Sequence, residues 1–154
     1  MFGSPFPQCS RTLFSILFAA CVWAQQPADN AVDQKCGVRA ESVLSERLAI
    51  WQQRLKLQDW KISILMSNPN EMRPSSLGNI RWDAGKKSAV IRVLHPAAYR
   101  LACREMLADM EFTVVHELIH LELSSLPRSQ ASRSDEEHAV NHIAEALLEL
   151  DRGK

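Results

Sequence analysis

The sequence predicts an α+β domain, in which helices pack on a small antiparallel sheet of about three strands. Apolar residues recur at helical spacing in residues 38–57, and apolar and polar residues alternate in the next segments. A helical pattern then returns after Pro96 and continues close to the end of the chain. With 154 residues, the chain is long enough for one such domain and short for two.

Residues 61–66 alternate apolar and polar side chains and are expected to form the first strand. Two further β-like runs, 78–82 and 88–94, flank a turn around Gly85 and predict a hairpin. The helical pattern is strongest over residues 106–125, which Pro127 terminates. The expected order is therefore one helix, three strands and two helices.

The last helix is expected over residues 135–150, with Ser134 as its N-cap and acidic residues in its first turn. On a helical wheel its apolar residues form one stripe: Val140, Ile143, Leu147 and Leu150.

Residues 1–24 are interpreted as a signal peptide and not as part of the fold. The apolar run 13–23 follows Arg11, is too short to span a bilayer, and ends in small residues that suit a signal peptidase. The alternatives are a buried or membrane-anchoring helix, or lipid attachment at Cys21. Residues 25–37 then form a flexible leader, and residues 38–154 form the domain. We expect export to the periplasm or medium, with no stable membrane span in the mature chain.

Export leaves Cys36 and Cys103 as a pair in an oxidising compartment. They are either joined in a disulfide or two unrelated buried thiols.

Charge gives no sign of a nucleic-acid partner. The 18 basic and 18 acidic side chains cancel, and no basic stripe is present. The composition does not indicate an oligomeric state.

The run His116-Glu117-Leu118-Ile119-His120 carries the clearest chemistry. Residues four apart share a helix face, so both imidazoles can bind one Zn²⁺ ion, and Glu117 can act as a general base on a water there. The surrounding helix is apolar on nearly every side, and buried polar groups need partners. The alternative is a chance match, with both histidines hydrogen-bonded in the core.

A third ligand is expected from the last helix. Glu137 lies at the edge of the apolar stripe, and Asn141, one turn later, can support a ligand by hydrogen bonding. Glu136 remains the alternative ligand, whereas His138 and His142 fall away from the stripe and are expected at the surface.

HExxH followed by Glu137-x-x-x-Asn141 resembles the gluzincin metallopeptidases, especially their minimal single-domain forms. The family often has Asp where this chain has Asn141. The resemblance implies a zincin-like fold, zinc held by His116, His120 and Glu137, and an edge strand that binds substrate backbone. The matching segment here includes Asn79, Ile80 and Arg81. The candidates for stabilising the oxyanion are His95, Tyr99, Arg128 and His142, and the resemblance favours none of them.

The predicted function is zinc-dependent hydrolysis of peptide bonds in a peptide or protein substrate, by a zinc-activated water with Glu117 as base. One alternative is a zinc-binding module without turnover. Another is a cytosolic regulatory protease of the same fold, with residues 1–24 misinterpreted.

Overall fold

The computed structural model describes residues 27–74, 76–127 and 133–153, so residues 1–24, interpreted as a signal peptide, lie outside the described part. The order of elements is the expected one, and the α+β class is confirmed. The elements are α1 (Pro27–Arg54), β1 (Lys61–Ser67), β2 (Gly78–Asp83), β3 (Ser88–Leu94), α2 (Cys103–Glu122) and α3 (Arg133–Arg152).

Helix α1 begins at Pro27, inside the segment 25–37 that was expected to be a flexible leader. Proline is favourable in the first turn of a helix, and residues 28–36 contain no other helix breaker. The expectation was wrong because the apolar pattern becomes visible only from Val38 onward. A helix can begin before its buried face does.

The sheet is mixed and not antiparallel as expected. Its order is β1-β3-β2, with β3 antiparallel to β2 but parallel to β1. The β2–β3 hairpin was predicted correctly. Parallel pairing needs a long connection, and residues 68–87, which include β2, supply one. Alternation of side chains reveals a strand but not the direction of its neighbour, so the sequence pattern did not distinguish the two arrangements.

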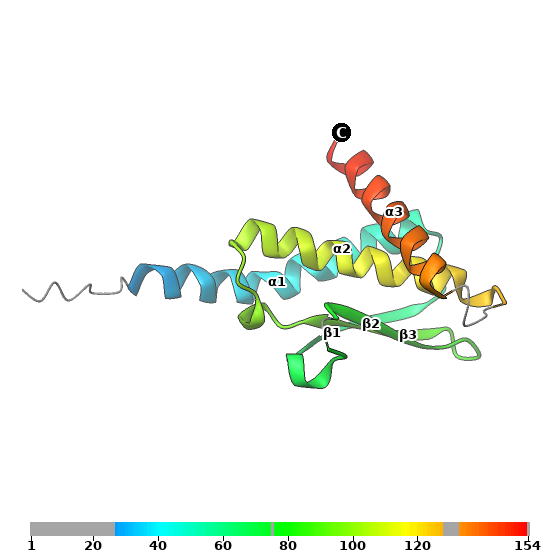
Figure 1. Ribbon diagram of the computed structural model, residues 1–154, viewed down its shortest axis with the longest axis horizontal. Helices are drawn as coiled ribbons and strands as arrows, with labels where there is room; N and C mark the ends of the chain where they lie inside the picture. Colours follow the sequence, from blue (N-terminus) through cyan, green and yellow to red (C-terminus); the bar gives the residue numbers. More distant parts are fainter. Residues whose placement is uncertain (1–26, 75, 128–132, 154) are drawn as a thin grey trace, which may run out of the picture.

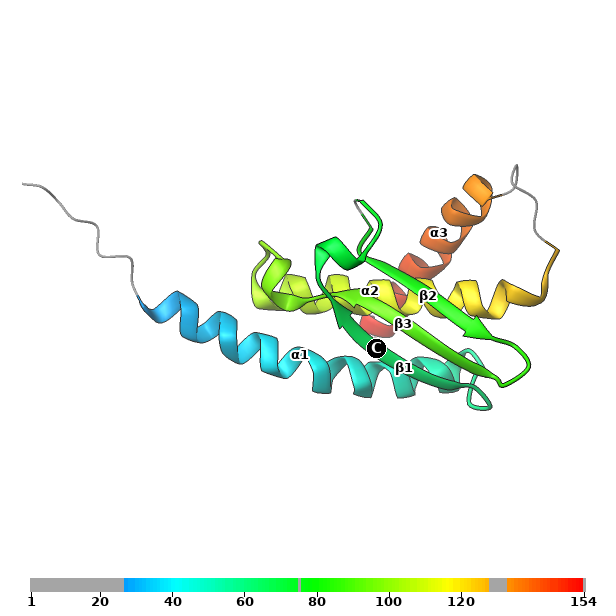
Figure 2. The ribbon, with the colours of Figure 1, turned by 90° about the horizontal axis from the view of Figure 1, so that it is seen from below.

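The helices α1 and α2 cover one face of the sheet, and α3 leans against α2 (Figures 1 and 2). The central strand β3 alternates buried Ala89, Ile91 and Val93 with the more exposed residues between them. The core also includes fully buried side chains from all three helices: Leu44, Trp51, Val114, Leu118 and Val140. Helix α2 is buried along most of its length, as its apolar composition predicted.

The buried row of α3 is Val140, Ala144 and Leu148, whereas Ile143 and Leu150 of the expected stripe are exposed. Where α3 crosses α2, residues that are four apart on α3 pack against α2. At this contact the small side chain of Ala144 is favoured over bulkier ones. Glu136 continues this row by one further turn, which brings it against α2.

Cys36 and Cys103 form a disulfide, with their Cα atoms 5.8 Å apart. Of the two alternatives that the sequence left open, the structure therefore contains the bond. It joins α1 to the first residue of α2.

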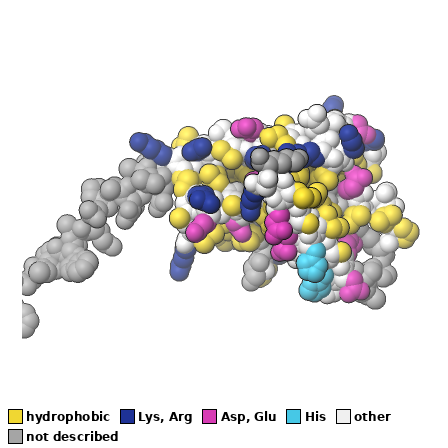
Figure 3. Space-filling view, turned by 90° about the horizontal axis from the view of Figure 1, so that it is seen from above, with side chains coloured by type: hydrophobic (Ala, Val, Ile, Leu, Met, Phe, Trp, Pro, Cys, Tyr) yellow, Lys and Arg dark blue, Asp and Glu magenta, His cyan; other side chains and the backbone are white. Residues whose placement is uncertain are grey.

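Basic and acidic side chains are interspersed on the face shown in Figure 3, in accord with the zero net charge. Within the described ranges, no helix is sufficiently long and apolar to cross a membrane.

Candidate metal centre

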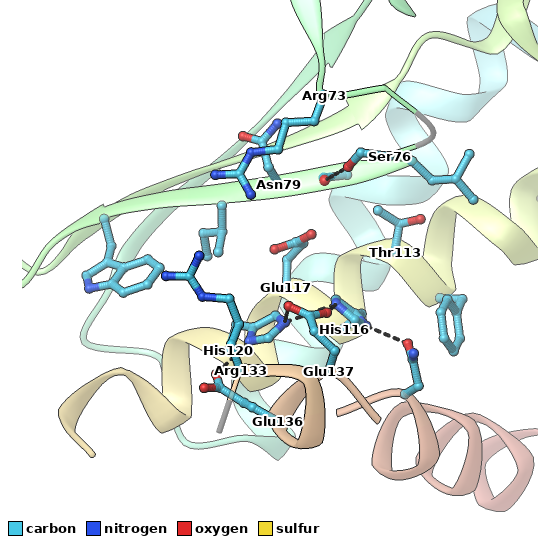
Figure 4. A pocket seen from close by; sticks show the side chains of 16 residues that line it. Arg73, Ser76, Asn79, Thr113, His116, Glu117, His120, Arg133, Glu136 and Glu137 are labelled. Atoms are coloured by element: carbon cyan, nitrogen blue, oxygen red, sulfur yellow. Dashed lines mark hydrogen bonds and ion pairs between the residues drawn. The ribbon is translucent and has the colours of Figure 1, made fainter. Parts of the chain in front are cut away.

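Two imidazoles on one face of α2 point to a common position. The Nε2 atoms of His116 and His120 lie 3.0 Å apart (Figure 4). Both rings are largely buried, because α2 runs between the sheet and α3. Burial, followed by the nearby His120, lowers the pKa of His116 and so favours its neutral, metal-binding form.

Glu137 brings a carboxylate to the same position from α3. One oxygen, Oε2, lies 3.4 Å from His116 Nε2, and the other, Oε1, lies 3.4 Å from His120 Nε2. Donor atoms around a tetrahedral zinc ion, each about 2.1 Å from it, are separated by about 3.4 Å. The three donor groups of His116, His120 and Glu137 could therefore hold a metal ion.

Residues of α3 contact the Nδ1 atoms of both histidines. Nδ1 of His116 lies 2.9 Å from Asn141 Oδ1, and Nδ1 of His120 lies 3.0 Å from Glu136 Oε1. Because these oxygens accept hydrogen bonds, the two contacts favour the tautomer with the proton on Nδ1 and a lone pair on Nε2. Two lone pairs and a carboxylate then face one another, an arrangement that a cation between them stabilises.

These contacts separate the roles of the two acidic candidates on α3. Glu137 faces both Nε2 atoms, whereas Glu136 contacts the far side of the His120 ring. Glu137 is thus the one of the two that lies with His116 and His120 in a group able to hold a metal ion, and Asn141 contacts His116 from the same helix. Glu136 corresponds to the outer carboxylate that commonly orients a metal-binding histidine.

Glu117 is a buried carboxylate beside these donors, with 7% of its surface exposed. Burial, followed by the charge of Glu137, raises the pKa of Glu117 to about 7, and Arg73 opposes this shift. A carboxyl group with such a pKa can exchange protons near neutral pH, which suits general acid–base chemistry.

Gly78 allows β2 to approach α2 at Glu117. A Cβ at this position would lie 2.3 Å from the Thr113 methyl group and 3.1 Å from Glu117 Oε1. A side chain there would require the Thr113 side chain, α2 or β2 to shift. The glycine therefore sets the distance between the strand and the carboxylate.

The donors line a cleft of about 500 Å³ between β2 on one side and α2 and α3 on the other. Asn79 and Ile80 line it, as the resemblance implied, and Ile80 shares the strand face of Gly78 that points to α2. Arg81 was expected beside them but is not part of the lining. Asn79 and Arg81 share the strand face opposite to Gly78 and Ile80, but of these two only Asn79 is part of the lining.

None of the four residues considered for the oxyanion is found in the described lining of the cleft. His95 and Tyr99 line a different cavity beside the disulfide, and His142 is exposed on α3. Arg128 lies outside the described residues.

The sequence analysis missed Arg73, Thr113 and Arg133, which also line the cleft. Arg133 is four residues before Glu137, so helical spacing alone could have placed it on the same face. Arg73 had no comparable signal, because a loop residue is positioned only by the fold.

Comparison of the chain with protein-family models, with curated proteins and with solved structures finds no match.

Proposed function

We propose that the protein is a zinc-dependent hydrolase that cleaves peptide bonds, a small metallopeptidase of the gluzincin kind with a zincin-like domain. The observation that carries this proposal is the convergence of His116, His120 and Glu137 at ion-binding spacing, with Glu117 next to them. A purely structural zinc site is usually closed by four protein ligands, whereas a catalytic site leaves a position open. Three donor groups beside an open cleft fit the catalytic kind.

In this proposal His116, His120 and Glu137 hold the zinc ion, while Asn141 and Glu136 orient the two imidazoles. When bound, the ion would polarise the scissile carbonyl and lower the pKa of a water molecule. Glu117 accepts the proton of the attacking water and passes it to the leaving amine. Its raised pKa suits both transfers.

Strand β2 lies at an edge of the described sheet and borders the cleft. An edge strand has backbone N–H and C=O groups that can pair with an extended peptide. The substrate backbone would lie along β2 near Asn79 and Ile80. In this position the bond to be cleaved would lie next to Glu117.

We also propose that the protein is exported, to the periplasm or the medium, or less favourably anchored by lipid at Cys21. The Cys36–Cys103 disulfide supports this, because such bonds persist in oxidising compartments. Mass spectrometry of the mature N-terminus tests the proposal. An N-terminus near residue 25 is expected, and retention of residue 1 favours a cytosolic protease.

The test of the enzyme proposal compares Glu117→Ala with Glu137→Ala in metal content and in digestion of a peptide library. Glu117→Ala should retain about one zinc per chain but lose a factor of about 10² to 10⁴ in turnover. Glu137→Ala should lose zinc and turnover together, because a ligand is missing. Glu145→Ala, an exposed position on α3, is the matched control.

Wild-type turnover in Glu117→Ala would contradict the role of Glu117 as base. If the wild-type protein binds zinc and cleaves no peptide, the protein is a zinc-binding module. Absence of zinc from the wild-type protein would contradict both the hydrolase proposal and the zinc-binding module.

A further inference from the structure

Two guanidinium groups line the cleft in addition to the metal-binding donors. Arg133 reaches from the first turn of α3 across the cleft toward β2, and Arg73 approaches from the loop before β2 (Figure 4). They come from different elements and lie on different sides of Glu117. Neither is required to hold the proposed metal.

Arg133 is an exposed arginine on α3 that does not pair with the glutamates that follow it on the helix. Glu136 and Glu137 follow it by three and four residues, the spacing at which helical ion pairs form. Both carboxylates instead face the histidines of α2. Among the described residues, no carboxylate lies within 4.0 Å of the Arg133 guanidinium. With respect to the residues that the structure describes, its charge and its hydrogen-bond donors are therefore available to a ligand in the cleft.

Arg73 acts on the cleft from the other side. It is close enough to Glu117 to lower the pKa of that carboxyl group, and it likewise forms no ion pair with the described residues. The cleft thus presents two cations, one on either side of the proposed bond-cleaving position, and neither forms an ion pair within the described part of the chain. A neutral peptide gives neither of them a charged partner.

A guanidinium binds a carboxylate through two parallel hydrogen bonds, which gives both strength and orientation. We propose that the site selects substrates that carry a carboxylate close to the cleaved bond, and that Arg133 is the principal group that binds it, assisted by Arg73. This inference rests on the proposed peptidase function. The carboxylate has two sources with the same chemistry: the free C-terminus of the substrate, or an internal Asp or Glu side chain.

The test measures binding separately from turnover. The full chain with Glu117→Ala, loaded with zinc, is titrated with acetylated alanine-rich hexapeptides of one length. One ends in a free acid with a central Gln, one ends in an amide with a central Gln, and one ends in an amide with a central Glu. One or both of the carboxylate peptides should bind about 10-fold to 100-fold more tightly than the neutral peptide. Preference for the free acid assigns a carboxypeptidase, and preference for the central Glu assigns an acidic internal site.

Arg133→Gln in the same background should remove this preference, and Arg133→Lys should restore part of it, because lysine keeps the charge but lacks the fork. Arg152→Gln, on the last turn of the same helix about 28 Å away, is the control and should keep the preference. Equal binding of all three peptides would overturn the inference, as would an unchanged preference in Arg133→Gln. The second outcome would also show that the carboxylate binds another group, such as the metal or Arg73, and not Arg133.

Turnover of the same peptides by the protein with Glu117 intact distinguishes the remaining cases. If no peptide is cleaved, the peptidase proposal fails, while the binding data still decide whether the cleft selects a carboxylate. If Arg133→Gln lowers kcat for all three peptides by the same factor with KM unchanged, the arginine acts on the transition state and not on a substrate carboxylate. That result would contradict the inference.

Discussion

At the scale of single residues, the site depends on how each histidine uses its two ring nitrogens. The Nδ1 atoms are engaged by Asn141 and Glu136 of α3, and the Nε2 atoms face Glu137. An imidazole that is fixed in this way presents its lone pair in one direction and in one tautomer. The residues behind the histidines should therefore affect metal affinity without contacting the metal.

We expect Asn141→Ala and Glu136→Ala each to weaken zinc binding by about 10-fold to 100-fold, whereas His116→Ala or His120→Ala should abolish it. Competition with a chelating dye measures the affinity. Glu145→Ala serves as the control on the exposed face of α3. If Glu136→Ala loses more affinity than Glu137→Ala, Glu136 is the third ligand and Glu137 is not.

At the scale of elements, a group of ion pairs connects α1 to the other two helices. Arg47 forms ion pairs with Glu111 of α2 and Asp151 of α3, and Arg54 forms a second pair with Asp151 at 2.6 Å. Trp51 Nε1 donates to the same Glu111 carboxylate at 2.8 Å. These contacts fix the end of α3, whose beginning carries the glutamates of the proposed metal site.

Hydrogen bonds from Arg54 and Arg47 lower the pKa of Asp151 to about 2. A carboxyl group whose pKa is lower in the folded state stabilises the protein above its unfolded pKa, and this contribution disappears as the pH falls through the folded pKa. Asp151→Asn should therefore lower the free energy of unfolding by about 1–2 kcal/mol at pH 6. The difference from wild type should vanish between about pH 4 and pH 2.

Urea unfolding followed by tryptophan fluorescence at pH 6 and pH 2.5 measures this difference. Glu149→Gln, an exposed neighbour on α3, is the control and should leave both values unchanged. The difference between Asp151→Asn and wild type should be much smaller at pH 2.5 than at pH 6, and an equal difference at both pH values would mean that the contribution of Asp151 is packing and not charge.

At the scale of the whole molecule, the disulfide closes a loop that contains the end of α1 and the entire sheet. Its cysteines are separated by 67 positions. A cross-link over such a loop stabilises the fold mainly by restricting the unfolded chain. The bond lies at the first residue of α2, and His116 follows 13 residues, or about 20 Å, later along the helix.

Replacing both cysteines by serine should lower the free energy of unfolding by about 4 kcal/mol according to the loop-entropy relation. Zinc stoichiometry should be unchanged, because the metal-binding residues are remote from the bond. Denaturant unfolding of the metal-free protein and metal analysis of the folded variant test the two statements. Equal stability of the variant and wild type would show that the bond does not constrain the unfolded chain, and loss of zinc would show that it supports the site.

The sequence by itself determined what depends on neighbours along the chain. Alternation defined the hairpin arms, and the four-residue spacing of His116 and His120 placed both rings on one helix face. It also restricted the proposed third ligand to a few acidic residues of the last helix. These features are local, because secondary structure and helix faces follow from residues within a few positions of one another.

Only the tertiary structure decided the features that depend on how the elements cross. The parallel pairing of β1 with β3 and the bond between Cys36 and Cys103 are of this kind. The crossing of α3 over α2 likewise gave Glu136 and Glu137 different partners and brought Arg133 into the cleft beside Gly78. A displacement of α3 by one residue would exchange the partners of Glu136 and Glu137. The sequence pattern of α3 alone does not oppose such a displacement. The packing of Val140, Ala144 and Leu148 against α2 opposes it, because a close-packed interface accepts one register.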